Sequence, residues 1–132
     1  MKEWSEVLIH VRRGEEFLCT HRAPDGGGYW HVIAGGVEPG EEFHAAALRE
    51  LEEETGLALE RIEPIGEFAY VREPWESEPG LRVHVECFLA DVGPEWEPQL
   101  DREHDDYRWC MREEAIELLF WPEPAQLLRS LP

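Results

Sequence analysis

The sequence predicts one domain of the α/β or α+β class, spanning residues 1–132. Short segments rich in β-branched residues alternate with a few helical segments along the chain. A chain of 132 residues fits one domain, and a domain of this size buries roughly two-thirds of its unfolded surface. Neither an internal repeat nor a linker divides the sequence.

The first third of the chain reads as extended structure. We predict strands at Glu6–Val11 and Phe17–His21, on either side of a turn at residues 13–15. Glycine-rich residues 23–29 form a loop. A short extended piece, Trp30–Ala34, then leads to two glycines.

A helix is predicted from about Glu41 to Thr55. Pro39-Gly40 precedes it, and its first acidic residues, Glu41 and Glu42, would lie in the positive first turn. Gly56 is placed as its C-terminal stop, because a glycine there adopts the left-handed conformation easily.

The helical repeat divides the side chains of this segment between two faces. The face predicted to pack lies opposite Glu50 and Glu54. The small residues Ala46 and Ala47 are predicted beside the carboxylates, where they leave room for a metal cluster and a ligand. The predicted packing face carries Ala45, Leu48, Leu51 and Thr55.

The remaining elements are three strands and two closing helices. A turn-rich stretch at residues 72–80 separates the two longer strands. The predicted strands are Ile62–Val71, Leu81–Val92 and Tyr107–Met111, and the predicted helices are Arg112–Phe120 and Glu123–Leu131.

Composition excludes several classes of function. The formal charge of −18 argues against binding of a nucleic acid polymer, which needs basic clusters. A small polyphosphate remains compatible, since a bound metal reverses the local field. No apolar run reaches the roughly 20 residues that span a bilayer, and the N-terminus lacks a secretory signal. With three scattered cysteines that we expect to be free thiols, this predicts a cytoplasmic protein without a membrane partner.

Glu50, Glu53 and Glu54 are the most informative residues. On a helix, positions i, i+3 and i+4 share one face. Three carboxylates so close repel one another unless a cation lies among them. A hard divalent ion with oxygen ligands, most simply Mg²⁺, answers that need.

The stretch from Gly35 to Leu57 resembles the signature of the Nudix hydrolases, G-x5-E-x7-R-E-U-x-E-E-x-G-U, where U is a bulky aliphatic residue. The alternative is a solvated, charged helix, but the glycines at both ends and the complete spacing favour the signature. Glu42 and Glu52 occupy variable places and are expected to be solvated. The nine fixed places are filled by Gly35, Glu41, Arg49, Glu50, Leu51, Glu53, Glu54, Gly56 and Leu57.

This resemblance implies an α/β/α sandwich with a mixed β-sheet between helices. It also implies hydrolysis of a phosphoanhydride with Mg²⁺ or Mn²⁺ bound by Glu50, Glu53 and Glu54, with Glu53 and Glu54 also counted as catalytic. A backbone carbonyl near Gly35 or Gly36 would complete the ligands. Arg49, four residues before Glu53, is expected to orient that carboxylate rather than contact the substrate.

A second segment, Glu103 to Trp109, resembles the E-H-x-x-Y-x-W stretch of many Nudix hydrolases. By that resemblance Glu103 is an additional metal ligand or the general base, and we place Tyr107 among the substrate-binding residues. In the alternative interpretation the acids face water while Tyr107 and Trp109 enter the core. His104 either positions substrate or lies on the surface.

Two further charged residues are candidates. Arg22 precedes the loop that leads to the signature, where relatives often place a basic residue against the substrate phosphates; the alternative is a solvated arginine. Glu86 interrupts an apolar strand and is either a metal-side carboxylate or an outward-facing residue. Five aromatics could stack on a base or belong to the core, and none is assigned: Tyr29, Trp30, Phe68, Tyr70 and Trp75.

The substrate class is less strongly indicated. Segments outside the signature look most like dihydroneopterin triphosphate pyrophosphatases, which favours cleavage of a nucleoside or pterin triphosphate to a monophosphate and pyrophosphate. Diadenosine tetraphosphate hydrolases commonly carry Pro-Lys-Gly where this chain has Ile33-Ala34-Gly35, which disfavours a dinucleotide. ADP-ribose is a third possibility. A nucleotide- or metal-sensing module without turnover would be expected to lack a signature glutamate, and none is missing. Monomer and homodimer both remain open.

Overall fold

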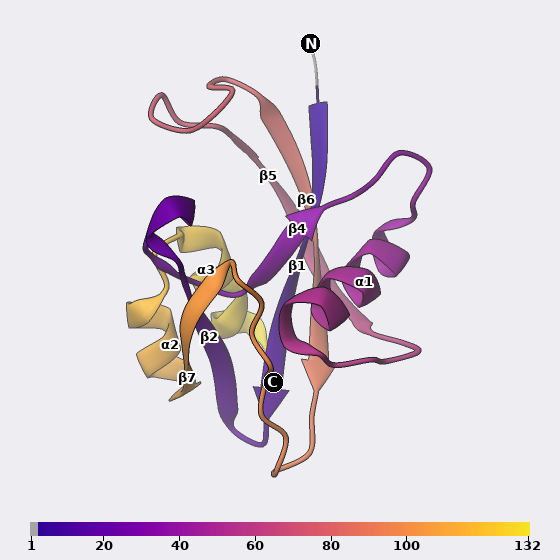
Figure 1. The fold of residues 1–132 in the computed structure, drawn as a ribbon, viewed down its shortest axis with the longest axis vertical. Helices are drawn as coiled ribbons and strands as arrows, with labels where there is room; N and C mark the ends of the chain where they lie inside the picture. Colours follow the sequence, from indigo (N-terminus) through magenta and orange to yellow (C-terminus); the bar gives the residue numbers. More distant parts are fainter. Residues whose placement is uncertain (1–2) are drawn as a thin grey trace.

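Seven strands form one mixed sheet with helices on both faces in the computed structural model, which describes residues 3–132 (Figure 1). The predicted first residue of the domain lies outside the described range. The elements are β1 (Glu3–Arg13), β2 (Glu16–Arg22), the 3-10 turn η1 (Pro24–Gly26), β3 (Trp30–His31), β4 (Ile33–Gly36), α1 (Phe43–Thr55), β5 (Glu63–Val71), β6 (Arg82–Asp91), β7 (His104–Met111), α2 (Arg112–Leu118) and α3 (Pro122–Ser130).

The sheet forks along one edge of its central strand. β1 runs parallel to β6 over its length, from the pair Glu3–Arg82 to the pair Arg12–Asp91. Along its other edge, residues 6–9 of β1 pair with β4 and residues 12–13 pair with β2, both antiparallel. β2 continues the sheet to β3 and β7, so β4 and β2 leave β1 as two branches. The space between these branches is where the site lies.

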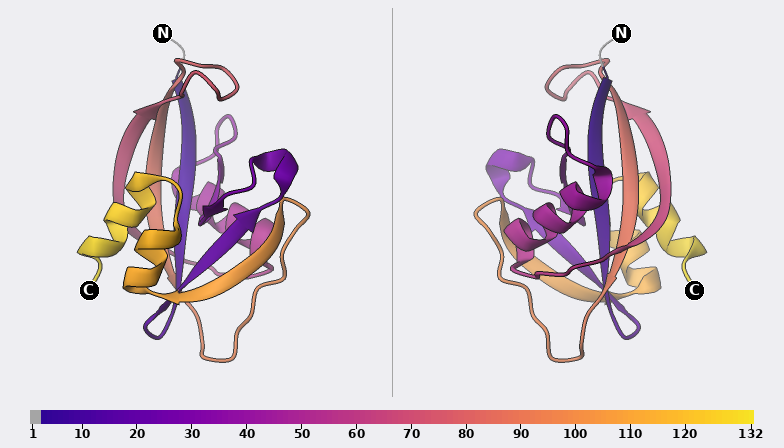
Figure 2. Two further views of the ribbon diagram at one scale, coloured as in Figure 1. Left: turned by 90° about the vertical axis from the view of Figure 1, so that its left-hand side faces the viewer. Right: turned by 90° about the vertical axis from the view of Figure 1, so that its right-hand side faces the viewer.

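Helices cover the two faces of the sheet, as Figure 2 shows from both sides. On the face under α1, Val7 and Ile9 pack with Leu51 of the helix, whereas the opposite face packs Leu8 and other apolar residues against α2 and α3. The predicted α/β/α sandwich with a mixed sheet is therefore confirmed.

Most predicted elements are present, with shifted ends. Helix α1 begins at Phe43 rather than near Glu41, so neither acidic residue before it lies in its first turn. Gly56 ends it as predicted, with φ 80°. The predicted extended piece Trp30–Ala34 divides into β3 and β4. The last strand starts at His104, because the acidic segment pairs with β2 instead of forming a loop.

The predicted faces of α1 need correction. Ala45 is exposed, while Ala46 and Ala47 are completely buried in the core with Leu51. Glu54, three residues beyond Leu51, is also buried. The helix therefore packs and presents carboxylates along one continuous stripe, and the two alanines bring it close to the sheet instead of leaving room for a ligand.

Two other expectations concern the whole chain. Cys19, Cys87 and Cys110 are buried free thiols, as predicted. Among residues 3–132, no helix has the length and apolar character needed to cross a membrane.

Candidate active site

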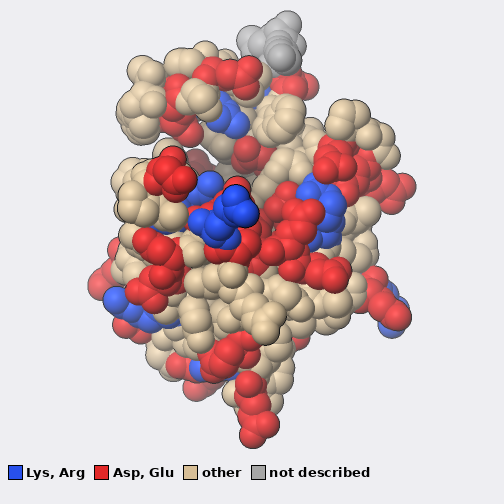
Figure 3. All heavy atoms as spheres, viewed as in Figure 1, with Lys and Arg blue, Asp and Glu red and all other residues tan. Residues whose placement is uncertain are grey.

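A cavity of about 420 Å³ opens between the two branches of the sheet. Strands β1, β2 and β4 contribute to its wall, together with helix α1 and the start of α3. Figure 3 shows basic and acidic side chains next to each other around a hollow in this face of the molecule. The predicted site residues that line the cavity are Arg22, Gly35, Glu50, Glu53 and Glu103.

Gly35 provides space for the Glu50 carboxylate. A Cβ atom at this position would fall on the carboxylate of Glu50, so any other residue would push that side chain away. Gly35 and Gly36 are also the candidates for a backbone carbonyl ligand. Of these two carbonyls, that of Gly36 accepts a hydrogen bond from Arg49 Nη2 (2.9 Å). The first glycine of the signature is therefore explained by a steric requirement.

Arg49 binds signature carboxylates, but its shorter contacts are with Glu41 and Glu50 rather than with Glu53, the predicted partner. It donates to both oxygens of Glu41, from Nε and Nη2, at 2.9 Å each. Its Nη1 donates to Glu50 at 2.9 Å, whereas the contact with Glu53 is longer, at 3.4 Å. The bidentate contact lowers the pKa of Glu41 to about 2. Arg49 thus ties the turn before α1 to Glu50, which accounts for Glu41 in the signature.

Glu54 is the most buried of the three signature glutamates. Its side chain is 2% exposed, compared with 12% for Glu50 and 57% for Glu53. Burial raises its pKa well above the usual range, and the nearby Glu50 and Asp101 carboxylates add to the effect. Within the described chain, neither Glu54 oxygen has a hydrogen-bond partner. A buried, unpartnered carboxylate next to others is a fitting ligand for a divalent cation.

His104 connects Glu54 to a further carboxylate. Its side chain is fully buried, with Nδ1 2.9 Å from Asp101 Oδ1 and Nε2 3.6 Å from Glu54 Oε1. Neither predicted position is correct, because His104 lies beneath the site, away from both the surface and the cavity wall. Only the folded chain brings a residue of β7 behind the last turn of α1.

Glu103 and Arg22 meet at the opposite wall. The backbone carbonyl of Glu103 accepts a bond from Ala23 (2.9 Å), which places the start of β7 against the end of β2. Glu103 lines the same cavity as Glu50 and Glu53, and its charge adds to the raised pKa of Glu54. Arg22 forms no ion pair among residues 3–132, and its Nε is buried without a partner. Its guanidinium lies 5.9 Å from the Tyr29 ring and is available to an anion in the cavity.

Tyr107 does not join the site. Its hydroxyl donates to Glu97 (3.1 Å), which also accepts from the Trp109 indole (2.9 Å). It packs in the cluster under α1 and does not line the cavity. The placement corresponds to the alternative interpretation, in which the aromatics of this strand face the core.

Several cavity residues were not assigned from the sequence. Glu6 accepts a bond from the Tyr70 hydroxyl (3.1 Å) and lies 3.5 Å from Arg72. Burial raises the pKa of Glu6. Aromatic rings add apolar wall, and no spacing rule distinguishes them from core aromatics. These are Tyr29, Phe68, Tyr70 and Trp121.

The comparisons with known proteins agree with this geometry. The NUDIX domain model matches residues 4–131. This chain belongs to the Nudix family. Its Nudix relatives include the asymmetrical bis(5'-nucleosyl)-tetraphosphatase of Caenorhabditis elegans, 33% identical over 77% of this chain and 72% of that protein. The NAD-capped RNA hydrolase NudC of Haemophilus influenzae is 31% identical over 95% of this chain but 45% of its own length. A Myxococcus xanthus octanoyltransferase is 36% identical over 94% of this chain and 34% of that protein.

Solved Nudix structures show the same fold. The C. elegans Ap4A hydrolase in a binary complex superposes with a TM-score of 0.77 and 28% identity, covering 96% of this chain and 93% of that one. The Escherichia coli dihydroneopterin triphosphate pyrophosphohydrolase gives 0.82 at 20% identity, over 99% and 97% of the two chains, which supports the fold alone. The chain therefore has the domain and the fold of the Nudix hydrolases, which generally use a divalent ion such as Mg²⁺ or Mn²⁺.

Proposed function

We propose that this Nudix hydrolase cleaves a nucleoside or pterin triphosphate to the monophosphate and pyrophosphate. One observation carries the proposal: a single cavity joins the signature carboxylates, the unpaired Arg22 guanidinium and a set of aromatic rings. Carboxylates and arginine suit the two ends of a metal–polyphosphate, and the rings suit one planar heterocycle.

Each residue has a distinct proposed task. Glu50, Glu53 and Glu54 would hold Mg²⁺ or Mn²⁺, which neutralises phosphate charge and lowers the pKa of a water when bound. Arg22 would bind the phosphates, and Arg49 holds Glu50 in position. Glu103 or a signature glutamate would take the proton from water, with Gly35 keeping the approach to Glu50 open.

A dinucleoside tetraphosphate is the second candidate, favoured by the similarity to the C. elegans enzyme. Buried free thiols suit a reducing compartment, and we infer action on small molecules in the cytoplasm. Turnover of pterin and nucleoside triphosphates, dinucleoside polyphosphates and ADP-ribose, compared by kcat/KM, discriminates these candidates. Product analysis in ¹⁸O water identifies the phosphorus attacked.

Glu53→Gln and Glu54→Gln test the site itself. Each should lower Mg²⁺-dependent kcat/KM by about a hundredfold or more, since even partners of a metal ligand are worth ~10–100-fold. Glu52→Gln is the matched control, because Glu52 is an exposed glutamate of the same helix. A folded Glu54→Gln protein with wild-type turnover would show that Glu54 is not a ligand.

A further inference from the structure

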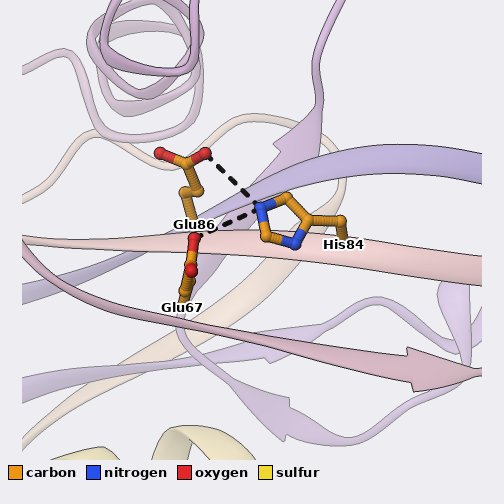
Figure 4. A group of neighbouring side chains, drawn as sticks. All are labelled: Glu67, His84 and Glu86. Carbon is orange, nitrogen blue, oxygen red and sulfur yellow. Dashed lines mark hydrogen bonds and ion pairs between the residues drawn. The ribbon is translucent and has the colours of Figure 1, made fainter.

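A second group of metal-binding side chains lies on the sheet, outside the cavity. Glu67 of β5 pairs directly with Glu86 of β6 across the antiparallel ladder, and His84 is two residues from Glu86. Figure 4 shows the two carboxylates and the imidazole directed toward one another. None of the three lines the cavity, which favours the outward-facing interpretation of Glu86 over a carboxylate on the metal side of the cavity.

The distances make this a set of three ligand atoms. His84 Nε2 lies 3.4 Å from an oxygen of Glu67 and 3.4 Å from an oxygen of Glu86. One ligand atom from each residue lies within 4.8 Å of the others, and within residues 3–132 this is the one set of three that does so. Among residues 3–132, neither Glu67 nor Glu86 forms an ion pair with a lysine or an arginine.

The strands hold the three side chains in place at an electrostatic cost. Like charges directly opposite on neighbouring strands are unfavourable, so Glu67 and Glu86 need a cation between them. The His84 ring stands edge-on to Phe43, the first residue of α1, at 5.5 Å and 88°. Continuous pairing of residues 66–71 of β5 with β6 and this aromatic contact pre-organise the group, while 38% exposure of His84 leaves it open to solvent.

We propose that Glu67, His84 and Glu86 bind a borderline transition-metal ion of the Zn²⁺ class. An imidazole nitrogen with two carboxylate oxygens suits Zn²⁺, with water in the remaining position. Mg²⁺ prefers an all-oxygen shell and keeps most of its water. This site would therefore discriminate against the Mg²⁺ used at the cavity, and it is independent of the proposed function.

The test is a Zn²⁺ titration of the full chain in millimolar Mg²⁺, followed by the ¹⁵N signals of the histidine rings. We expect the Nε2 signal of His84 to move with bound Zn²⁺. Because partners of a metal ligand alone are worth ~10–100-fold in affinity, His84→Gln and Glu67→Gln should each weaken binding at this site by at least about tenfold. Both residues are exposed enough for the variants to fold.

His21→Gln is the matched control, since His21 lies 2.7 Å from a single carboxylate, that of Asp105. It should leave the His84 response unchanged. An unchanged His84 signal at saturating Zn²⁺, or equal affinity in His84→Gln, would overturn the proposal and leave a protonated histidine between two carboxylates as the explanation of the cluster.

Discussion

At the scale of single residues, the chemistry of the site depends on how Glu54 is surrounded. A carboxylate with 2% exposure and no hydrogen-bond partner in the described chain is unfavourable unless a cation or a proton neutralises it. Helical spacing explains why Glu50 is near, and the tertiary fold adds Asp101, Glu103 and His104. The surroundings of Glu54 therefore come from two distant parts of the chain, the helix α1 and the segment at residues 101–104.

His104 should control metal affinity without touching the substrate. In His104→Asn, the amide nitrogen replaces Nδ1 and can still donate to Asp101. In His104→Gln, the amide nitrogen replaces Nε2 and lies near Glu54. We expect His104→Asn to weaken Mn²⁺ binding by about 10–100-fold, as for other residues that orient a metal ligand, with His104→Gln closer to wild type. Calorimetric Mn²⁺ titration measures this independently of turnover. Equal affinities in both folded variants would limit His104 to packing.

At the scale of the secondary structure elements, α1 packs and binds along the same stripe. Ala46 and Ala47 are fully buried with Leu51 in the core, and the buried Glu54 and the cavity-lining Glu50 lie on the same side of the helix. Small residues allow the close approach, and that approach buries Glu54. Packing of the helix and the properties of its carboxylates are consequently coupled.

Ala47→Leu tests this arrangement, with Ala45→Leu as the matched control. Extra methylenes in a packed core cost roughly 1–3 kcal/mol, so Ala47→Leu should lower the free energy of unfolding by about that amount. Ala45 is exposed, and its change should stay within about 0.5 kcal/mol. Urea unfolding of the metal-free proteins measures both. Greater destabilisation by Ala45→Leu would restore the face predicted from the sequence.

At the scale of the whole molecule, burial keeps two histidines neutral, His10 beside α3 and His31 in the cavity wall. His10 Nε2 lies 3.1 Å from the Pro124 carbonyl, and burial lowers the pKa of His10 to about 4 and that of His31 to about 3. In the unfolded chain both histidines have an ordinary pKa of about 6.5. At a pH between the lowered values and 6.5, the unfolded chain therefore binds protons at these histidines that the folded chain does not bind.

The stabilisation from neutral His10 should therefore be complete above about pH 6.5 and be lost as the pH falls toward 4. His10→Gln, which keeps a donor toward Pro124, should flatten the fall in unfolding free energy between these pH values. Each pKa unit corresponds to about 1.4 kcal/mol. Urea unfolding across pH 4–8 gives the two slopes, and parallel slopes would exclude His10 as a source of acid sensitivity.

The family and most secondary structure elements could be predicted from the sequence, because they depend on contacts between residues close together in the chain. The spacing of Gly35, Glu41, Arg49 and the three glutamates identifies the family, since Gly35, Glu41 and Arg49 serve contacts within one turn and one helix. Strand alternation and the glycine stop of α1 predicted most elements, with errors at their ends.

Long-range packing decided the rest. Sequence spacing cannot show that His104 lies behind Glu54, that Tyr107 turns to Glu97, or that Trp121 reaches the cavity. Each depends on how the branches of the forked sheet and the final helix are placed. The sequence by itself determined which carboxylates lie close together on one helix, because they repeat at helical spacing. Only the tertiary structure decided how deeply each is buried, and burial sets how strongly each carboxylate favours a neutralising proton or cation.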